Sequence, residues 1–553
     1  HLRYTYAWTW PAQPGLSEIQ SWGESRDMKV ASVGLHVLNV RKSSRLRLYR
    51  LRLDEPVSAT GWVDRFGQRS TGAWPGKVFS DADLRDQDAR EEAALPALAP
   101  ATARDEYRAW TGRPALSASG WFRLERVAGV WWLVAPSGRL YWSSAVDCVV
   151  HGIEARLDDA SRPAYSWLPP DAGEFANAWG HGPGEPNTHW PAFYRVNLIR
   201  KWGPTGEYAK WRERAYRRLL AWNFTGLGNW CDESLFRDHR LPYVTMGPHP
   251  WLAQVPYAGN KLQDVYDPAF AREAAKAAAP LAAWKDDPWC VGHFIENECG
   301  WADLPGEVLG LPTNRPAKAR FLELLRAAHG TVAGLNAAWR IAATSFESAR
   351  LPADEAKLTA AAQRDAARFR GEFAERYYRE WSRAIRAVDP HHLLLGGRFH
   401  GGNRQDEVLS ACGRYCDVVS VNHYSTEIPR AEFDRWHRVS GKPLLIGEYA
   451  FESLDRGLLT TAVPVADSQE RAVGYRYYTE QLATLPYAVG AHYFQYLDEP
   501  VTGRFDRETS FNGLVNVADV PDETLTLAAR ETNERVYWLH LGQLAPFAQR
   551  PRR

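Results

Sequence analysis

The sequence has no excess of either charge and no long apolar run. Its 67 lysines and arginines nearly balance its 66 aspartates and glutamates, which leaves a net charge of +1 over 553 residues. A surface for nucleic acid or for an anionic membrane would favour a clear positive excess. No segment approaches the roughly 18 consecutive apolar residues of a membrane-spanning helix. We therefore expect no nucleic-acid partner and no membrane partner.

The sequence also lacks the signatures of several cofactor and metal chemistries. Its six cysteines form no CxxC pair and no Cys/His metal spacing, and the spacing favours no particular disulfide pairing. It contains no G-x-S-x-G, no HExxH, no P-loop and no dinucleotide fingerprint. We therefore expect no cofactor and no metal, and these absences argue against phosphoryl transfer and dinucleotide chemistry.

Aromatic residues, in contrast, are abundant, with 25 tryptophans and 24 tyrosines. Flat aromatic rings pack against the C–H faces of sugars, so the composition is compatible with carbohydrate binding. We expect most of these rings to anchor the core and the loops.

The sequence pattern divides the chain into three regions. In residues 1–55, apolar residues occur in short runs or alternate with polar ones, without a helical period. This pattern predicts a small N-terminal β-rich domain resembling an abbreviated sandwich. Residues 56–118 have mixed character and predict a linker that wraps the next domain, and residues 119–553 predict the catalytic domain. The chain begins at His1 rather than at methionine, which fits a processed N-terminus and favours a secreted or periplasmic protein.

From residue 119 onward, short apolar runs alternate with helical segments. A hairpin is predicted over 122–134, and helices are predicted from 267, over 314–328 and over 355–388. Eight runs predict strands: 140–146, 226–230, 243–247, 292–298, 393–398, 418–424, 444–448 and 490–495. Eight strands alternating with helices predict an α/β fold of the parallel (β/α)8 TIM-barrel type, whose chemistry lies at the C-terminal ends of the strands.

Two of these strands end on a glutamate, Glu298 on the fourth and Glu448 on the seventh. A glycosidase needs such a pair, because one carboxyl protonates the leaving oxygen while the other attacks or stabilises the anomeric carbon. Burial and a neighbouring carboxylate would both raise the pKa of Glu298, which suits a general acid. The structural alternatives are a buried Asn297–Glu298 pair that caps the strand and a Glu448 paired with a barrel arginine such as Arg398.

Other polar and aromatic residues end the same strands and predict a sugar-binding shell. The substrate-binding candidates are Asn297, Asn229, Trp230, His249, Trp301, His423, Tyr424, His492 and Gln495. Taken singly, a residue of each of these types is more often a core residue with its hydrogen bonds made inside the protein than a ligand-binding residue. Either Tyr449 or Tyr424 is expected to donate its hydroxyl to Glu448. Glu296 precedes Glu298 by two residues, so it is expected on the same face, one layer deeper, as a structural or orienting carboxylate.

Taken together, these motifs resemble the β-agarases of glycoside hydrolase family 50. The matching segments are 294–298, 415–424, 445–448, 492–500, Phe66-Gly-Gln, Trp74-Pro-Gly-Lys77 and Asn533-Glu-Arg. The resemblance covers residues 60–540, and its Asn-Glu plus Glu pattern is shared by all clan A barrel glycosidases. Tyr493 departs from it, because relatives are expected to have tryptophan there.

The resemblance implies a retaining double displacement on a β-linked galactose-containing polysaccharide or oligosaccharide. Glu298 would be the acid/base and Glu448 the nucleophile. Two alternatives stay open: another clan A activity, such as β-galactosidase or β-mannanase, and a non-catalytic carbohydrate-binding barrel. The sequence favours neither exo nor endo action and no particular oligomeric state.

Overall fold

The computed structural model describes residues 60–98, 100–159, 161–248, 253–352, 357–453, 455 and 463–552. The predicted N-terminal β-rich region at 1–55 lies outside the described residues, and so does His249. The division into three regions therefore stays a prediction.

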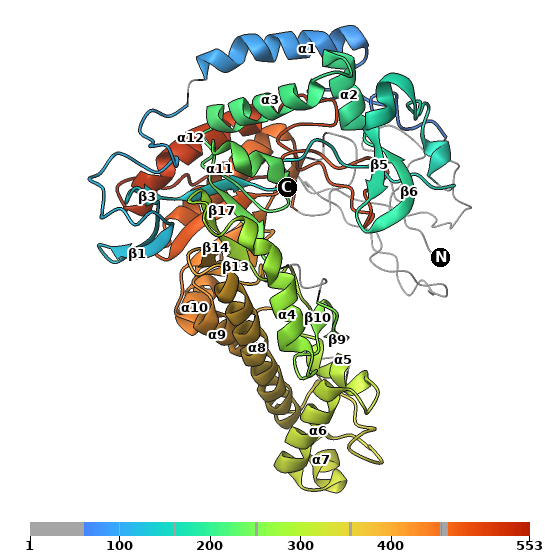
Figure 1. Cartoon of the computed structure of the whole chain (residues 1–553), viewed down its shortest axis with the longest axis vertical. Helices are drawn as coiled ribbons and strands as arrows, with labels where there is room; N and C mark the ends of the chain where they lie inside the picture. The colour runs from blue at the N-terminus through green and yellow to red at the C-terminus, as the bar shows by residue number, and fades with distance from the viewer. Residues whose placement is uncertain are drawn as a thin grey trace, which may run out of the picture.

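An eight-stranded parallel sheet forms the centre of the fold (Figure 1). Its order is β12-β11-β8-β7-β4-β17-β14-β13. The strands are β4 (Ser143–Val146), β7 (Gly226–Leu227), β8 (Tyr243–Met246), β11 (Cys290–Phe294), β12 (Leu393–Leu394), β13 (Val419–Asn422), β14 (Leu444–Tyr449) and β17 (Ala488–Tyr493). Neighbouring strands pair in parallel throughout. A parallel bridge between Phe399 and Val421 then joins the two outer strands, so the sheet is strongly curled.

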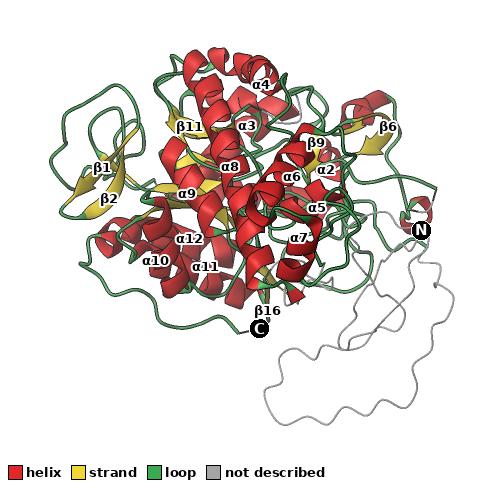
Figure 2. Ribbon diagram, turned by 90° about the horizontal axis from the view of Figure 1, so that it is seen from below, coloured by secondary structure: helices red, strands yellow, loops and turns green. Residues whose placement is uncertain are grey.

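Helices surround this curled sheet, and small hairpins lie at its ends (Figure 2). The α-helices are α1 (Asp81–Ala94), α2 (Phe193–Trp202), α3 (Glu207–Ala221), α4 (Phe270–Ala278), α5 (Leu304–Gly310), α6 (Pro316–His329), α7 (Val332–Trp339), α8 (Ala360–Val388), α9 (Asp406–Tyr415), α10 (Arg430–Ser440), α11 (Ser468–Ala483) and α12 (Glu523–His540). The remaining strands are β1 (Arg123–Val127), β2 (Val130–Val134), β3 (Leu140–Tyr141), β5 (Trp179–Gly182), β6 (Glu185–Pro191), β9 (Tyr257–Gly259), β10 (Leu262–Gln263), β15 (Glu452–Ser453) and β16 (Pro464–Val465).

Helix α8 is 29 residues long and extends well beyond the sheet. Its C-terminal half packs on α9, whereas its N-terminal half packs with α5, α6 and α7 in a helical lobe that projects from the sheet (Figure 1). One apolar stripe serves both contacts, because buried positions recur every three or four residues: Ala362, Ala366, Phe369, Phe373, Tyr377, Trp381 and Ile385. Among the described helices, none has the length and hydropathy of a membrane span.

The predicted elements correspond to observed ones with small changes at their ends. The hairpin at 122–134 is confirmed as β1 and β2. The helix predicted over 314–328 is α6, which Gly330 closes in a left-handed conformation with φ 67°. The single strand predicted over 140–146 is in fact two, β3 and β4. Between them, the Trp142 N–H bonds to the Tyr537 hydroxyl of α12 at 3.2 Å instead of to a strand.

The segment expected to be a linker contains helix α1, which begins at the side-chain cap of Ser80. Ion pairs tie this helix to α3, since Arg218 contacts Glu91 at 2.6 Å and Arg214 contacts Asp88 at 3.0 Å. These contacts hold the segment against the outer helices.

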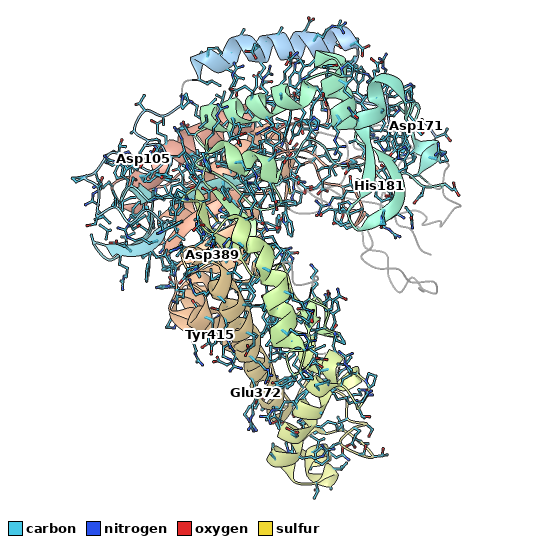
Figure 3. The ribbon with its side chains drawn as sticks, viewed as in Figure 1. Asp105, Asp171, His181, Glu372, Asp389 and Tyr415 are labelled. Carbon is cyan, nitrogen blue, oxygen red and sulfur yellow. The ribbon has the colours of Figure 1, made fainter. Side chains whose placement is uncertain are left out.

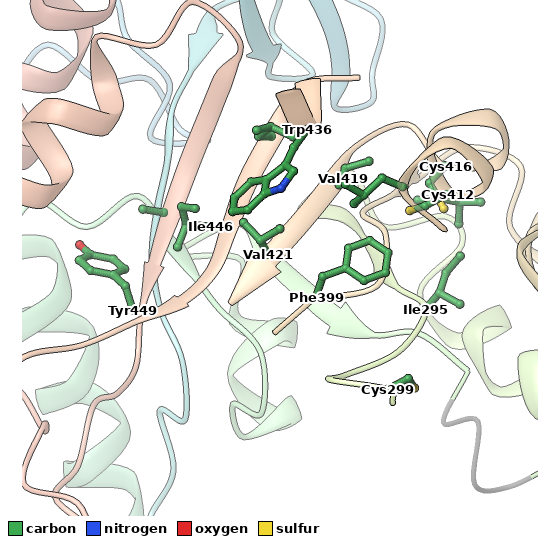
Figure 4. Packing of buried hydrophobic residues seen from close by; sticks show 14 of the residues in the cluster. Ile295, Cys299, Phe399, Cys412, Cys416, Val419, Val421, Trp436, Ile446 and Tyr449 are labelled. Carbon is green, nitrogen blue, oxygen red and sulfur yellow. The ribbon is translucent and has the colours of Figure 1, made fainter. Parts of the chain in front are cut away.

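Apolar side chains pack on both faces of the sheet. Outside, Val419, Val421 and Ile446 pack toward Trp436 of α10 and Cys412 of α9 (Figure 4). Inside, a second cluster includes Val244, Val291, Phe294, Leu445 and Val489. Toward the C-terminal ends of the strands, the inward side chains become polar, and the candidate site begins there.

Candidate active site

Glu448 reaches the interior of the sheet because β14 contains a bulge. Val421 pairs with Ile446 but Asn422 pairs with Glu448, so Gly447 is an extra residue with no partner in β13. A bulge interrupts the alternation of a strand, and Glu448 therefore turns inward although Ile446 packs outward. The close fit needs glycine, because a Cβ at position 447 would lie 2.7 Å from Asn422 Oδ1.

Glu448 is buried and held by two donors. Arg398 donates to Glu448 Oε1, and the Tyr424 hydroxyl donates to Oε2 at 2.7 Å. Charge-assisted hydrogen bonds of this kind stabilise the ionised carboxylate, which suits a nucleophile. The structure thus contains both the Tyr424 contact expected for catalysis and the Arg398 pairing expected for a structural role. Tyr449 instead contacts Thr479 at 2.8 Å.

Arg398 connects Glu448 to two other strand ends. Its Nη2 contacts Asp147 Oδ2 at 3.2 Å, and its Nε donates to Asn297 Oδ1 at 2.8 Å. Asp147 follows β4 directly, is fully buried and accepts the Asn229 N–H at 2.6 Å. One arginine therefore fixes groups from the first, fourth and seventh strands of the sheet around a common centre.

Glu298 lies in the loop after β11, with a left-handed φ of 55°. Asn422 Nδ2 donates to Glu298 Oε1 at 2.9 Å, and His400 Nδ1 lies 3.4 Å from the same oxygen. Since Asn422 also faces Gly447 beside Glu448, it lies between the two glutamates. The predicted pair therefore meets at one end of the sheet.

The electrostatic surroundings of the two glutamates differ. Burial, and then the charge of Glu448, raises the pKa of Glu298, while His400 and Asn422 partly oppose this rise. Glu298 can therefore keep a proton at higher pH than an ordinary glutamate, as a general acid requires. Burial likewise raises the pKa of Asp147 to about 7, against the opposing influence of Arg398 and with a further increase from Glu448.

Besides Tyr424, four of the predicted shell residues lie around this centre. Asn297 accepts from Arg398, and Asn229 and Trp230 follow β7 beside Asp147. Neither atom of the buried Asn229 amide has a hydrogen-bond partner among the described residues. Gln495 donates to Glu499 at 3.0 Å, and its Oε1 is likewise unpaired there. Buried amides without partners are rare, and a ligand with hydroxyl groups could satisfy them.

Two other shell candidates, Trp301 and His423, face away from this centre, and a third, His492, lies one layer below it. Trp301 is fully buried and donates to Glu296 at 3.1 Å. His423 faces the outer helices, where its Nδ1 contacts the Tyr478 hydroxyl at 2.9 Å. His492 is buried below Asp147 and contacts Ser143 Oγ at 2.9 Å. The hydrogen bonds of Trp301 and His423 are those of core residues, whereas the buried Nδ1 of His492 has no hydrogen-bond partner among the described residues.

Glu296 does not share a face with Glu298, which corrects the prediction. Its carboxyl accepts from Trp301 and from Tyr378 of α8, so it faces the helical layer. The alternation fails because β11 ends at Phe294 and the following residues leave the extended conformation. The expectation that Glu296 is a structural carboxylate agrees with these contacts.

The sequence reasoning missed Asp147 and His400, and it treated Arg398 only as a structural partner. Asp147 and Arg398 end predicted or observed strands, so the rule that polar strand ends face the mouth could have found both. His400 lies in the loop after β12, where no sequence pattern marks it.

One group of possible metal ligands lies at the opposite end of β11 and β12. One ligand atom each of Cys290, His293 and His392 lies within 4.8 Å of the others. Both rings already bond Asp389 (labelled in Figure 3), at 2.8 and 2.6 Å. Their other nitrogens contact Thr245 Oγ1 at 2.7 Å and the Asp287 carbonyl at 2.9 Å. Hydrogen bonds therefore account for every ring nitrogen of this cluster.

No family model matches the chain. Two curated proteins of Vibrio sp. (strain JT0107) do. Beta-agarase B is 29% identical over 94% of this chain and 60% of its own length. Beta-agarase A is 31% identical over 87% of this chain and 53% of its own length. The chain thus spans between half and three fifths of the length of these relatives.

Solved structures of agarases are also similar to it. The crystal structure of an agarase, AgWH50C, is 30% identical with a TM-score of 0.77, over 87% of this chain and 74% of that one. The chain belongs to the family of these agarases. An exo-beta-agarase structure is 29% identical, with the same TM-score, over 87% of this chain and 73% of that one.

Proposed function

We propose that this protein is a retaining glycoside hydrolase of family 50, in clan A of the (β/α)8-barrel glycosidases. Its proposed substrates are β-linked galactose-containing polysaccharides or oligosaccharides of the agarose type. The observation that carries the proposal is the pair formed by Glu298 and Glu448, whose surroundings favour a protonated acid and a charged nucleophile. The similarity to β-agarases along most of the chain supports the substrate class.

In the first step, Glu448 attacks the anomeric carbon while Glu298 gives its proton to the leaving glycosidic oxygen. The Arg398 and Tyr424 contacts hold the attacking carboxylate in one orientation, which lowers the entropic cost of the attack. The product is a glycosyl ester on Glu448.

In the second step, Glu298 is ionised and removes a proton from water, which attacks the ester and restores Glu448. Two inversions give overall retention of configuration. Retaining enzymes place their carboxyl groups about 5–5.5 Å apart, against roughly 6.5–9.5 Å for inverting ones.

The proposed sugar site is formed by polar groups at the same end of the sheet as the two glutamates. Asn229 and Gln495 offer amide atoms that lack partners among the described residues, and Asn297 is oriented by Arg398. Such groups recognise hydroxyls by hydrogen bonding, which gives specificity for a sugar rather than an apolar ligand. Because an agar polymer cannot cross a membrane intact, we also propose that the protein acts outside the cytoplasm.

The deciding experiment is hydrolysis of agarose and its oligomers, with the first-formed anomer read by ¹H NMR. A first-formed β-anomer is expected, whereas an α-anomer would exclude double displacement. E448Q should abolish turnover but keep oligosaccharide binding, and E323Q, on the exposed face of α6, is the matched control. Faster cleavage of simple aryl β-galactosides than of agarose oligomers would favour a β-galactosidase instead.

A further inference from the structure

His400 contacts Glu298 but has no role in the two steps above. Its Nδ1 lies 3.4 Å from Glu298 Oε1, and its ring lies 6.0 Å from that of Tyr424, the donor to Glu448. The His400 side chain is 47% exposed and that of Glu298 is 28% exposed. The contact is therefore at the open rim of the site, where solvent and substrate have access.

Several charged or titratable groups act on this pair. Glu448 from β14 raises the pKa of Glu298 after burial does, and Lys261 near β10 lowers it together with His400. Three other titratable groups interact with Glu298 or His400. They are Arg404, in the loop before α9, and His423 and Tyr424, which follow β13. Of the groups that lower the Glu298 pKa through their charge, His400 has a ring nitrogen only 3.4 Å from Glu298 Oε1.

The two steps require opposite states of Glu298. The first needs the protonated acid, which burial and the charge of Glu448 favour. The second needs the ionised base, and by then the ester on Glu448 has removed that negative charge. A cation that remains beside Glu298 would then have its largest relative influence, because its attraction is no longer opposed by a like charge on Glu448.

We propose that His400 is a positioning residue whose positive charge favours the carboxylate form of Glu298 and so assists the step in which Glu298 acts as the base. The inference rests on the proposed function. It assigns to His400 an electrostatic influence on Glu298 and no direct contact with the reacting carbon.

Two variants separate charge from hydrogen bonding. H400N keeps a neutral N–H donor near the position of Nδ1, whereas H400A removes both the donor and the charge. The matched control is H239N. His239 also contacts a carboxylate, Asp287, at 3.1 Å, and its side chain is 49% exposed, but it lies at the opposite end of the sheet. Thermal unfolding of all variants checks that they fold.

The readout is the basic limb of the pH profile of kcat/KM on agarose oligomers, which reports the general acid of the free enzyme. Loss of the His400 charge should let the pKa of Glu298 rise, so the limb should move upward by about half a unit in both H400N and H400A. H239N should leave it in place. An unmoved limb in both variants, or a limb restored by H400N, would overturn the inference.

A second measurement does not depend on turnover. The carboxyl carbon of Glu298 can be titrated by ¹³C NMR in glutamate-labelled protein, with the signal assigned by its loss in E298Q. An upward shift of the titration in H400N supports the role of His400 even if the wild type hydrolyses no galactan. An active wild type with an unshifted Glu298 titration would reject the role of His400 and leave the proposed function standing.

Discussion

The two ends of the curled sheet both contain a buried carboxylate held by cationic or imidazole side chains, yet they differ in how completely they are paired. At the N-terminal end of β11 and β12, Asp389 accepts from His293 and His392, and each ring nitrogen has a partner. At the C-terminal end, Arg398 holds Glu448 and Asp147, but the Asn229 amide and Asn422 Oδ1 are unpaired among the described residues. Burial and charge alone therefore do not distinguish a site from a structural network.

What distinguishes them is the remaining capacity for hydrogen bonds. A closed network can only stabilise the fold, since any ligand would first have to break it. A network with unpaired buried polar atoms destabilises the free protein, and a ligand that hydrogen-bonds to those atoms removes the destabilisation. We expect substitutions at the open end to change activity and those at the closed end to change stability.

The largest expected effect is at the open end. E448Q removes the nucleophile but keeps a side chain of the same size, so kcat should fall by about four orders of magnitude or more. The thermal midpoint should stay close to that of the wild type. The measurement is kcat on agarose oligomers beside a thermal melt, and a variant with near-normal kcat would show that Glu448 is not the nucleophile.

At the closed end, D389N should reduce the free energy of unfolding by about 3–5 kcal/mol, because it breaks a fully buried pair. The kcat of the folded fraction should not change. Urea unfolding followed by fluorescence measures the first quantity and an assay normalised to folded protein the second. Lost catalysis with unchanged stability would reverse the comparison between the two ends.

The same carboxylate gives the closed end a pH dependence. Burial alone would raise the pKa of Asp389, but the hydrogen bonds from His293 and His392 outweigh it and hold that pKa below its usual range. A carboxyl whose pKa is lowered by folding stabilises the folded state at pH values above its unfolded pKa, which is about 3.9 for aspartate. This contribution is lost as the pH falls toward the pKa of the folded state. Wild type should therefore lose more stability than D389N between pH 5 and pH 2, as measured by urea titrations; parallel curves would contradict this.

The smallest expected effect is that of N229A. It removes an unpaired buried amide, so stability should stay equal or rise slightly, while KM for agarose oligomers should increase by up to about tenfold, equivalent to one lost hydrogen bond. Initial-rate kinetics and a thermal melt measure both. T245V, at the closed end, is the control: it removes a hydroxyl bonded to His293 and should leave KM unchanged.

The sequence was sufficient to predict the eight parallel strands and the position of Glu448 on β14, whereas Glu298 lies four residues beyond the end of β11 rather than on the strand. Each strand is a short apolar run between helical segments, and this periodicity depends on local burial alone. The positions of Trp301 and Glu296 could not be predicted in the same way. Both lie beyond the last paired residue of β11, where the conformation is set by contacts with α8 that connect residues about 80 positions apart.

The shell was predicted only in part for the same reason. Asn229 and Gln495 each lie two residues past the end of their strands, on the side where the strands point, as the strand direction predicts. His423 lies one residue past β13 and turns outward to Tyr478. The alternation of side chains between the two faces of a sheet holds only within a strand. Beyond its end, tertiary packing determines which face a side chain occupies. His400 depends on the path of a loop that the sequence pattern leaves open.

The unpaired Gly447 makes the direction of Glu448 a property of two strands rather than one. If Gly447 instead paired with Asn422 in a regular ladder, the carboxylate of Glu448 would face outward, into the apolar layer beneath α10. Transfer of this site to another scaffold would therefore require β13 and β14 together. A graft of β14 alone would carry Glu448 without the strand pairing that directs its side chain inward.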